Sequence, residues 1–188
     1  MQPFPSSAKP LPKRDQTANP PGVLGPLFAA LDGYGGVIPI QSLQREVAAV
    51  IVTPEQLGDA IAIDTGAYVR TLVRETEHYE VLVMAWLPGQ RSPIHDHAGS
   101  GCTVRIVSGT ARESRYLPRA DGLVTRDATI TYLPGQVVSS FDRDIHDLGN
   151  AAACPASPRD ILVTIHVYSP KLAPTRKYVA ANDDAAVA

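Results

Sequence analysis

The chain has 188 residues, of which 44% are hydrophobic and 19% charged, and its formal net charge is −2. This composition is typical of a globular protein, and the lack of a basic surplus gives no sign of a nucleic-acid-binding surface. No apolar run approaches the ~20 residues that cross a bilayer, and the N-terminus lacks the basic and apolar regions of a secretory signal. We therefore expect a cytoplasmic protein without nucleic-acid, membrane or obligatory protein partners, in which Cys102 and Cys154 are reduced thiols.

The first part of the chain divides into a proline-rich and a helical segment. Residues 1–26 contain seven prolines, which interrupt backbone hydrogen bonding and predict a flexible or extended lead-in. Leu27, Phe28 and Leu31 then recur at helical spacing. Residues 53–56 combine a Thr N-cap, a proline at the first helical position and a Gln at N3. We expect helices over about residues 27–64.

From Tyr68 onward, short β-branched and aromatic runs alternate with Pro-Gly, Ser-Gly, Asp-Gly and Gly-Asn turn signals. Seven or more strands at such intervals predict an antiparallel sandwich or barrel rather than a parallel α/β sheet. We expect a single domain over residues 27–188, mainly β, with a small N-terminal helical cap and a β-barrel over about residues 65–172. The predicted strands are Tyr68–Val73, Tyr79–Leu87, Gly101–Val107, Ala111–Tyr116, Gly122–Tyr132, Gln136–Ser140 and Asp160–Tyr168.

Two of the five histidines, His95 and His97, lie two residues apart. In an extended segment, residues i and i+2 point to the same side, so both imidazoles would converge on one point. A catalytic metal site needs about three protein ligands and at least one open position. His146, at the edge of a later predicted strand, is the third candidate. The sequence therefore predicts a metal centre with three histidines.

The residues around this pair resemble the first motif of the cupin family. Gly89, His95, His97, Cys102 and Gly109 match its spacing. Most cupins place a carboxylate where Cys102 stands, and a cysteine there is similar to the thiol dioxygenases, specifically the cysteine dioxygenase family. The resemblance implies an antiparallel cupin barrel, or jelly roll.

Three further segments extend the resemblance over residues 68–170. The second cupin motif is matched by Leu133–Gly135 together with His146 and Asn150. Thr164–Pro170 is similar to the family segment Ser-x-His-x-Tyr-Ser-Pro, and Tyr68–Arg70 is similar to its Tyr-x-Arg substrate segment. Each match alone is weak, and the combination is specific.

The resemblance implies a reaction and a set of roles. His95, His97 and His146 would hold Fe(II), and L-cysteine with O₂ would give cysteine sulfinic acid. Tyr168 and His166, on one face of a predicted strand, would assist catalysis beside the iron. Cys102 is either a small buried hydrophobe, as free cysteine usually is, or the partner of Tyr168 in a thioether bond.

Arg70 is the residue expected to bind the substrate carboxylate, with Tyr68 beside it. A planar guanidinium forms a bidentate, charge-assisted pair with a carboxylate, which a lysine cannot reproduce. By resemblance, arginine at this place is similar to the cysteine-selective members, whereas relatives selective for 3-mercaptopropionate carry glutamine.

Other functions remain open from the sequence. The substrate could be another small thiol such as 3-mercaptopropionate or cysteamine, although cysteamine has no carboxylate for Arg70. A cupin that binds a metal without catalysis would explain three histidines, but not Arg70, His166 and Tyr168 together. A cupin-type isomerase usually retains the carboxylate that Cys102 replaces.

Overall fold

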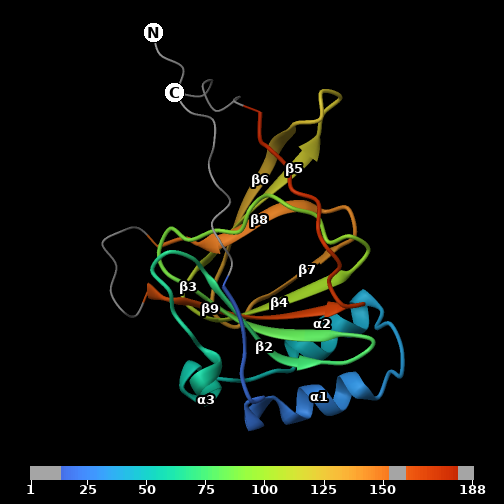
Figure 1. Cartoon of the computed structure of the whole chain (residues 1–188), viewed down its shortest axis with the longest axis vertical. Helices are drawn as coiled ribbons and strands as arrows, with labels where there is room; N and C mark the ends of the chain where they lie inside the picture. Colours follow the sequence, from blue (N-terminus) through green and yellow to red (C-terminus); the bar gives the residue numbers. More distant parts are fainter. Residues whose placement is uncertain (1–13, 153–159, 182–188) are drawn as a thin grey trace.

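The computed structural model describes residues 14–152 and 160–181, which form two β-sheets with helices against the larger one (Figure 1). The larger sheet has six strands in the order β1-β2-β3-β9-β4-β7, and the smaller has three in the order β6-β5-β8. Cys154 and residues 1–13 of the proline-rich segment lie outside the described residues. The prediction of a mainly β, jelly-roll fold is confirmed, with two separate sheets in place of one closed barrel.

Helices precede most of the strands along the chain. The larger sheet contains β1 (Arg14–Thr17), β2 (Val69–Glu75), β3 (Glu80–Trp86), β4 (Gly101–Ser108), β7 (Val137–Phe141) and β9 (Leu162–Ser169). The smaller sheet contains β5 (Ala111–Pro118), β6 (Val124–Tyr132) and β8 (Ile145–Asn150). The helices are α1 (Gly25–Asp32), α2 (Ile40–Ala48) and α3 (Pro54–Leu57), with short 3-10 turns η1 (Gly22–Leu24) and η2 (Gly58–Ala60).

Two strands differ from the expectation. β1 lies within residues 1–26, where the prolines predict no regular pairing, yet it pairs in parallel with β2. Residues 14–17 contain no proline, so each has a backbone N–H to donate. The segment is extended here, as one of the two expected forms, but the expected lack of strand pairing does not hold. β8 is absent from the predicted strands because its sequence, Ile-His-Asp-Leu-Gly-Asn, is rich in residues that strands disfavour.

The larger sheet has an apolar layer on each face, because successive side chains of a strand point to opposite sides. On the outer face, Val81 and Val83 belong to the same buried cluster as Leu43 of α2. On the inner face, Leu82 and Met84 belong to a second buried cluster. The helices therefore close the outer face, and the inner face remains available for a site.

The loop that follows β3 extends the smaller sheet at the edge formed by β8. Isolated antiparallel bridges join Arg91 to Gly149 and His95 to His146. A Cβ atom at Gly149 would lie 2.5 Å from both Arg91 Cγ and the Gln90 carbonyl oxygen, so the approach requires glycine. This close approach places His95 directly opposite His146.

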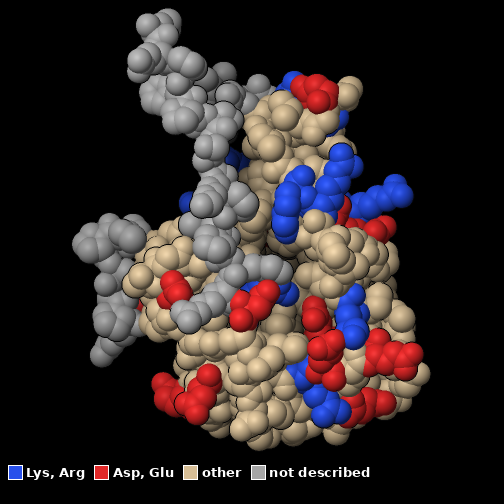
Figure 2. All heavy atoms as spheres, viewed as in Figure 1, with Lys and Arg blue, Asp and Glu red and all other residues tan. Residues whose placement is uncertain are grey.

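The surface carries charges of both signs. On the face drawn in Figure 2, acidic and basic side chains are interspersed, in keeping with the net charge of −2. None of the helices formed by the described residues is long and apolar enough to cross a membrane.

Candidate metal centre

The three predicted histidines converge. One ligand atom from each of His95, His97 and His146 lies within 4.8 Å of those of the other two. His146 comes from β8, and His95 is held opposite it by backbone hydrogen bonds of 2.9 and 3.0 Å in both directions. The His97 backbone N–H donates to the Asp142 carbonyl at 3.0 Å, which fixes the third ligand beside the pair.

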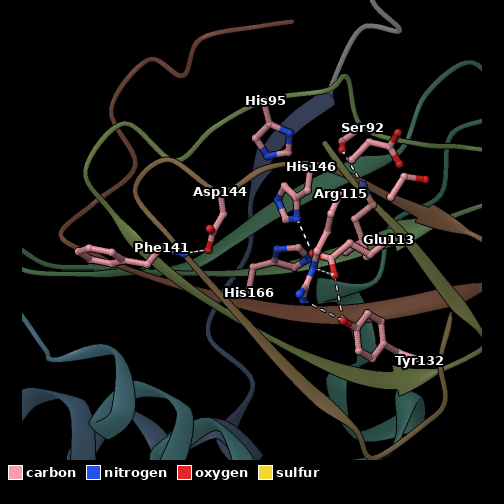
Figure 3. A network of polar contacts seen from close by, with 12 residues as sticks. Ser92, His95, Glu113, Arg115, Tyr132, Phe141, Asp144, His146 and His166 are labelled. Atoms are coloured by element: carbon pink, nitrogen blue, oxygen red, sulfur yellow. Dashed lines mark hydrogen bonds and ion pairs between the residues drawn. The ribbon is translucent and has the colours of Figure 1, made fainter. Parts of the chain in front are cut away.

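The ring nitrogens are oriented for an ion. His95 Nδ1 lies 2.8 Å from the Pro93 carbonyl oxygen, and His146 Nδ1 lies 2.6 Å from Glu113 Oε1 (Figure 3). A hydrogen bond at Nδ1 fixes the tautomer and leaves Nε2 with its lone pair for a metal. Within the described part of the chain, His97 Nδ1 is buried without a hydrogen-bond partner. Burying such an atom alone is costly, and a bound ion is the kind of partner that this group lacks.

The surroundings of His95 and His97 favour neutral imidazoles. Burial, followed by the influence of His146, lowers the pKa of His95 well below its ordinary value of 6.5. The same two causes lower the pKa of His97 to about 3. Neutral imidazoles are ligands for divalent transition metals, so the donor set fits such an ion.

Glu113 of β5 is the hydrogen-bond partner of the His146 imidazole. Its side chain is 1% exposed, and its Oε2 accepts hydrogen bonds from Arg115 Nε at 3.0 Å and Tyr132 Oη at 2.9 Å (Figure 3). Burial alone would raise the pKa of Glu113, but the hydrogen bond and charge interaction with His146, together with Tyr132, lower it. The carboxylate is therefore ionised, and it would polarise the imidazole on the side away from a bound ion.

The larger sheet supplies the facing wall of the same cavity, whose volume is about 570 Å³. Arg70 of β2 and Tyr68, the residue before that strand, line it, and the Tyr68 ring stacks on Trp86 with centroids 4.3 Å apart. The Arg70 guanidinium is 13% exposed and lies 3.5 Å from Asp15 Oδ1 of β1. All eight predicted site residues line this cavity: Tyr68, Arg70, His95, His97, Cys102, His146, His166 and Tyr168.

A hydrogen-bond chain ends at Tyr168. Trp86 Nε1–H donates to Thr164 Oγ1 at 3.0 Å, and Thr164 Oγ1 lies 2.9 Å from His166 Nε2. His166 Nδ1 lies 3.3 Å from the Tyr168 hydroxyl oxygen. Burial, then the positive charge of Arg70, lowers the pKa of His166 well below 6.5, so this imidazole is neutral.

Cys102 of β4 lies directly across from Tyr168 of β9 in the antiparallel register. Its side chain is 1% exposed. Burial raises the pKa of Cys102 to about 12. Burial, then the neighbouring Cys102, raises the pKa of Tyr168 well above its ordinary value. At neutral pH both groups are protonated, and they lie within reach of each other.

Comparison with known proteins assigns the family. A family model described as cysteine dioxygenase type I matches residues 38–181. This range contains all eight predicted site residues. The chain belongs to the cysteine dioxygenase type I family. The cysteine dioxygenase type 1 of Bos taurus is 23% identical over 152 residues, which cover 79% of this chain and 71% of the relative. That of Homo sapiens is 22% identical over 158 residues, with the same shares covered.

The fold of this family member has a counterpart among solved structures. An uncharacterized conserved protein with a double-stranded β-helix domain, from Klebsiella pneumoniae, superposes with a TM-score of 0.53. It is 18% identical, and the match covers 71% of this chain and 94% of that chain. At this identity the likeness concerns the fold alone, and it agrees with a cupin jelly roll.

The charged residues at the site that were not anticipated from the sequence include Glu113, which is the hydrogen-bond partner of His146, and Asp15 and Lys177, which line the cavity. For Glu113 a signal exists, because it shares a strand face with buried Ala111, and a charge on a buried face needs a partner. Asp15 and Lys177 come from segments without a strand pattern, and only the folded chain brings them to the site.

Proposed function

We propose that this member of the cysteine dioxygenase type I family is an Fe(II)-dependent dioxygenase that oxidises L-cysteine to cysteine sulfinic acid. One observation carries the proposal: the imidazoles of His95, His97 and His146 share a single cavity with the Arg70 guanidinium and the Tyr168 hydroxyl. His95, His97 and His146 would hold the iron. When bound, Fe(II) would supply the redox chemistry that adds both atoms of O₂ to the substrate sulfur.

The ligand set suits a thiol substrate. Histidine binds a metal through its neutral imidazole, so three histidine ligands would leave the full 2+ charge of the ion uncompensated, unlike a site with a carboxylate ligand. Such a centre favours an anionic ligand and lowers the pKa of a coordinated thiol. The substrate therefore enters as a thiol and is held as a thiolate.

Arg70 would receive the substrate carboxylate. Its side chain lines the same cavity as the stacked pair of Tyr68 and Trp86. A carboxylate can form two parallel hydrogen bonds with the guanidinium, and this fixes both the position and the orientation of the substrate. The ion pair with Asp15, which is 58% exposed, is of the weak kind that such a ligand can displace.

His166 would orient the Tyr168 hydroxyl. The indole N–H of Trp86 can only donate, so Thr164 accepts it and can give its own proton to His166 Nε2. The neutral imidazole then carries its proton on Nδ1, facing the Tyr168 oxygen. Tyr168 keeps its own proton to donate into the cavity, toward the bound substrate or oxygen.

We further propose that Cys102 and Tyr168 become joined by a thioether bond. The Cys102 S–H and one aromatic C–H of Tyr168 would be lost as a C–S bond forms, and O₂ would accept the two electrons and two protons as hydrogen peroxide. A buried thiol of raised pKa is unreactive by itself, so this step depends on the iron. Peptide mapping after aerobic incubation with Fe(II) should show a linked peptide lighter by two hydrogen atoms. Only free Cys102 peptide would contradict the bond.

One experiment tests the reaction. The purified full chain is loaded with Fe(II) without oxygen, and O₂ uptake and sulfinate formation are measured with L-cysteine, 3-mercaptopropionate and cysteamine. We expect one O₂ consumed per thiol and a preference for L-cysteine, with cysteamine poor because it lacks a carboxylate. The protein loaded with redox-inactive Zn(II) is the control. No thiol-dependent uptake would leave only a metal-binding cupin, and a preference for 3-mercaptopropionate would contradict the cysteine assignment.

We place the protein in the cytoplasm, where thiols stay reduced. Its partners there would be the small thiol substrate and O₂. Detection in a cell fraction other than the cytosol would contradict this part.

A further inference from the structure

Lys177 lines the cavity of the metal centre, and none of the roles proposed above is assigned to it. It belongs to the segment of residues 171–181, which follows β9 and runs along the loop that carries His95. Lys177 forms an isolated antiparallel bridge with His95. The Tyr178 N–H donates to the Ile94 carbonyl at 3.0 Å, and the Asp96 N–H to the Arg176 carbonyl at 3.3 Å. The segment is thus held against the metal-binding loop by its backbone.

This pairing decides where the lysine points. Residues directly opposite each other in an antiparallel pair lie on the same side of the sheet. The Lys177 side chain therefore lies on the side of the His95 imidazole, and it lines the cavity. It is also exposed, which places it at the cavity mouth. Its Nζ donates a hydrogen bond to Thr175 Oγ1 at 2.7 Å.

The neighbouring residue Arg176 points the other way. Its guanidinium carbon lies 5.2 Å from the centre of the Tyr178 ring. Its backbone N–H donates to Asp96 Oδ1 at 3.0 Å, and Arg176 is not among the residues that line the cavity. The two adjacent cations therefore differ in one respect that matters: only the Lys177 side chain lines the metal site.

The positive charge of Lys177 lies at the same cavity as the three histidines. A positive charge at this place opposes a metal cation and attracts an anion. Its two effects on ligands of opposite charge must have opposite signs.

We propose that Lys177 is a specificity-determining residue, whose ammonium draws anionic ligands to the metal centre at some cost in metal affinity. The identification of the anion as a thiol carboxylate rests on the proposed function. The effects on metal and anion binding do not, because they require only that the three histidines bind a divalent ion.

The test compares Lys177→Gln with Lys177→Arg and with Arg176→Gln, which removes the same charge one residue away. The affinity for Co(II) is measured by competition with a chelator, and azide binding to the Co(II)-loaded protein by visible absorption. At low salt, Lys177→Gln should lower the Kd for Co(II) and raise the Kd for azide, each by about two- to fivefold. High salt should shrink both effects. Lys177→Arg and Arg176→Gln should stay near the wild type.

The outcomes separate a charge effect from a structural one. Weaker binding of both Co(II) and azide in Lys177→Gln would indicate damage to the site and overturn the proposal. Unchanged binding, or an equal effect of Arg176→Gln, would overturn it as well. If the iron-loaded wild type consumes no O₂ with thiols, the proposed function fails while these two affinities still decide the role of Lys177. If it does, the KM for L-cysteine should rise in Lys177→Gln by the factor seen for azide.

Discussion

At the scale of single residues, Glu113 is expected to fix the orientation and raise the basicity of the His146 imidazole. Its carboxylate lies 2.6 Å from His146 Nδ1 and is itself fixed by Arg115 and Tyr132. Glu113→Gln removes the charge behind the imidazole but keeps the shape. Because such supports set ligand basicity, we expect metal affinity to fall by about ten- to a hundredfold.

A chelator competition titration with Co(II) measures this loss. Glu77→Gln, in the exposed turn between β2 and β3, is the matched control and should bind as the wild type does. Equal affinities of the Glu113→Gln protein and the wild type would show that the carboxylate is only a structural partner of Arg115.

Arg70 gives the second prediction at this scale. The Arg70 side chain is only 13% exposed. Arg70→Lys keeps its positive charge but loses the planar guanidinium, which can form two parallel hydrogen bonds with a carboxylate. The KM for L-cysteine should rise by about tenfold, the worth of one charge-assisted hydrogen bond. Steady-state O₂ uptake measures it. Cysteamine, which has no carboxylate, is the control substrate, and a parallel rise of its KM would mean that Arg70 supports the cavity instead of binding the carboxylate.

At the scale of elements, the contact between the β3–β4 loop and β8 positions the ligands. Gly149→Ala would push the loop away at Gln90 and Arg91, because the added Cβ would lie 2.5 Å from each. Since His95 is on that loop and His146 on β8, we expect Co(II) affinity to fall by about tenfold although no ligand is altered. Gly36→Ala, where a Cβ meets nothing within 4 Å, is the control. Unaltered Co(II) binding by Gly149→Ala would show that the loop adapts.

The sequence predicted those helices and strands whose own residues form a short-range pattern. The strands β2 to β7 and β9 have β-branched alternation and turn signals, and the Thr53–Gln56 capping box at α3 forms with a 2.9 Å hydrogen bond. The pair His95 and His97 could be assigned because two side chains of an extended segment point the same way. Each of these features is local.

The elements and site residues that the sequence did not predict depend on tertiary contacts. β1 forms only because β2 offers it an edge, and β8 is a strand only because β5 and the β3–β4 loop pair with it on either side. The same holds for Lys177, which reaches the site through a bridge with His95. No pattern within these segments predicts such pairings, because their partners are distant in the chain.

At the scale of the whole molecule, the buried histidines predict how stability depends on pH. The pKa of His97 is lowered from 6.5 to about 3 in the folded protein, so between these values the unfolded chain binds a proton that the folded one does not. Stability therefore falls as the pH is lowered from 6.5 toward 3. His95 and His166 act in the same direction. The midpoint temperature of thermal unfolding of the metal-free protein should therefore decrease as the pH is lowered from 6.5 toward 3.

Circular dichroism melts at several pH values measure this dependence. His97→Gln cannot take up the proton, so its unfolding midpoint should vary less steeply with pH than that of the wild type. Parallel curves for the two proteins would show that His97 is not held neutral by its surroundings.

The bridge between His95 and His146 has a consequence beyond the site. An ion bound there would join the loop that leaves the larger sheet to a strand of the smaller one, two parts of the chain that are distant in sequence. A ligand that binds only the folded state stabilises it in proportion to the logarithm of the free ligand concentration. Resistance to proteases, and with it the lifetime of the protein in a cell, would then follow the supply of metal.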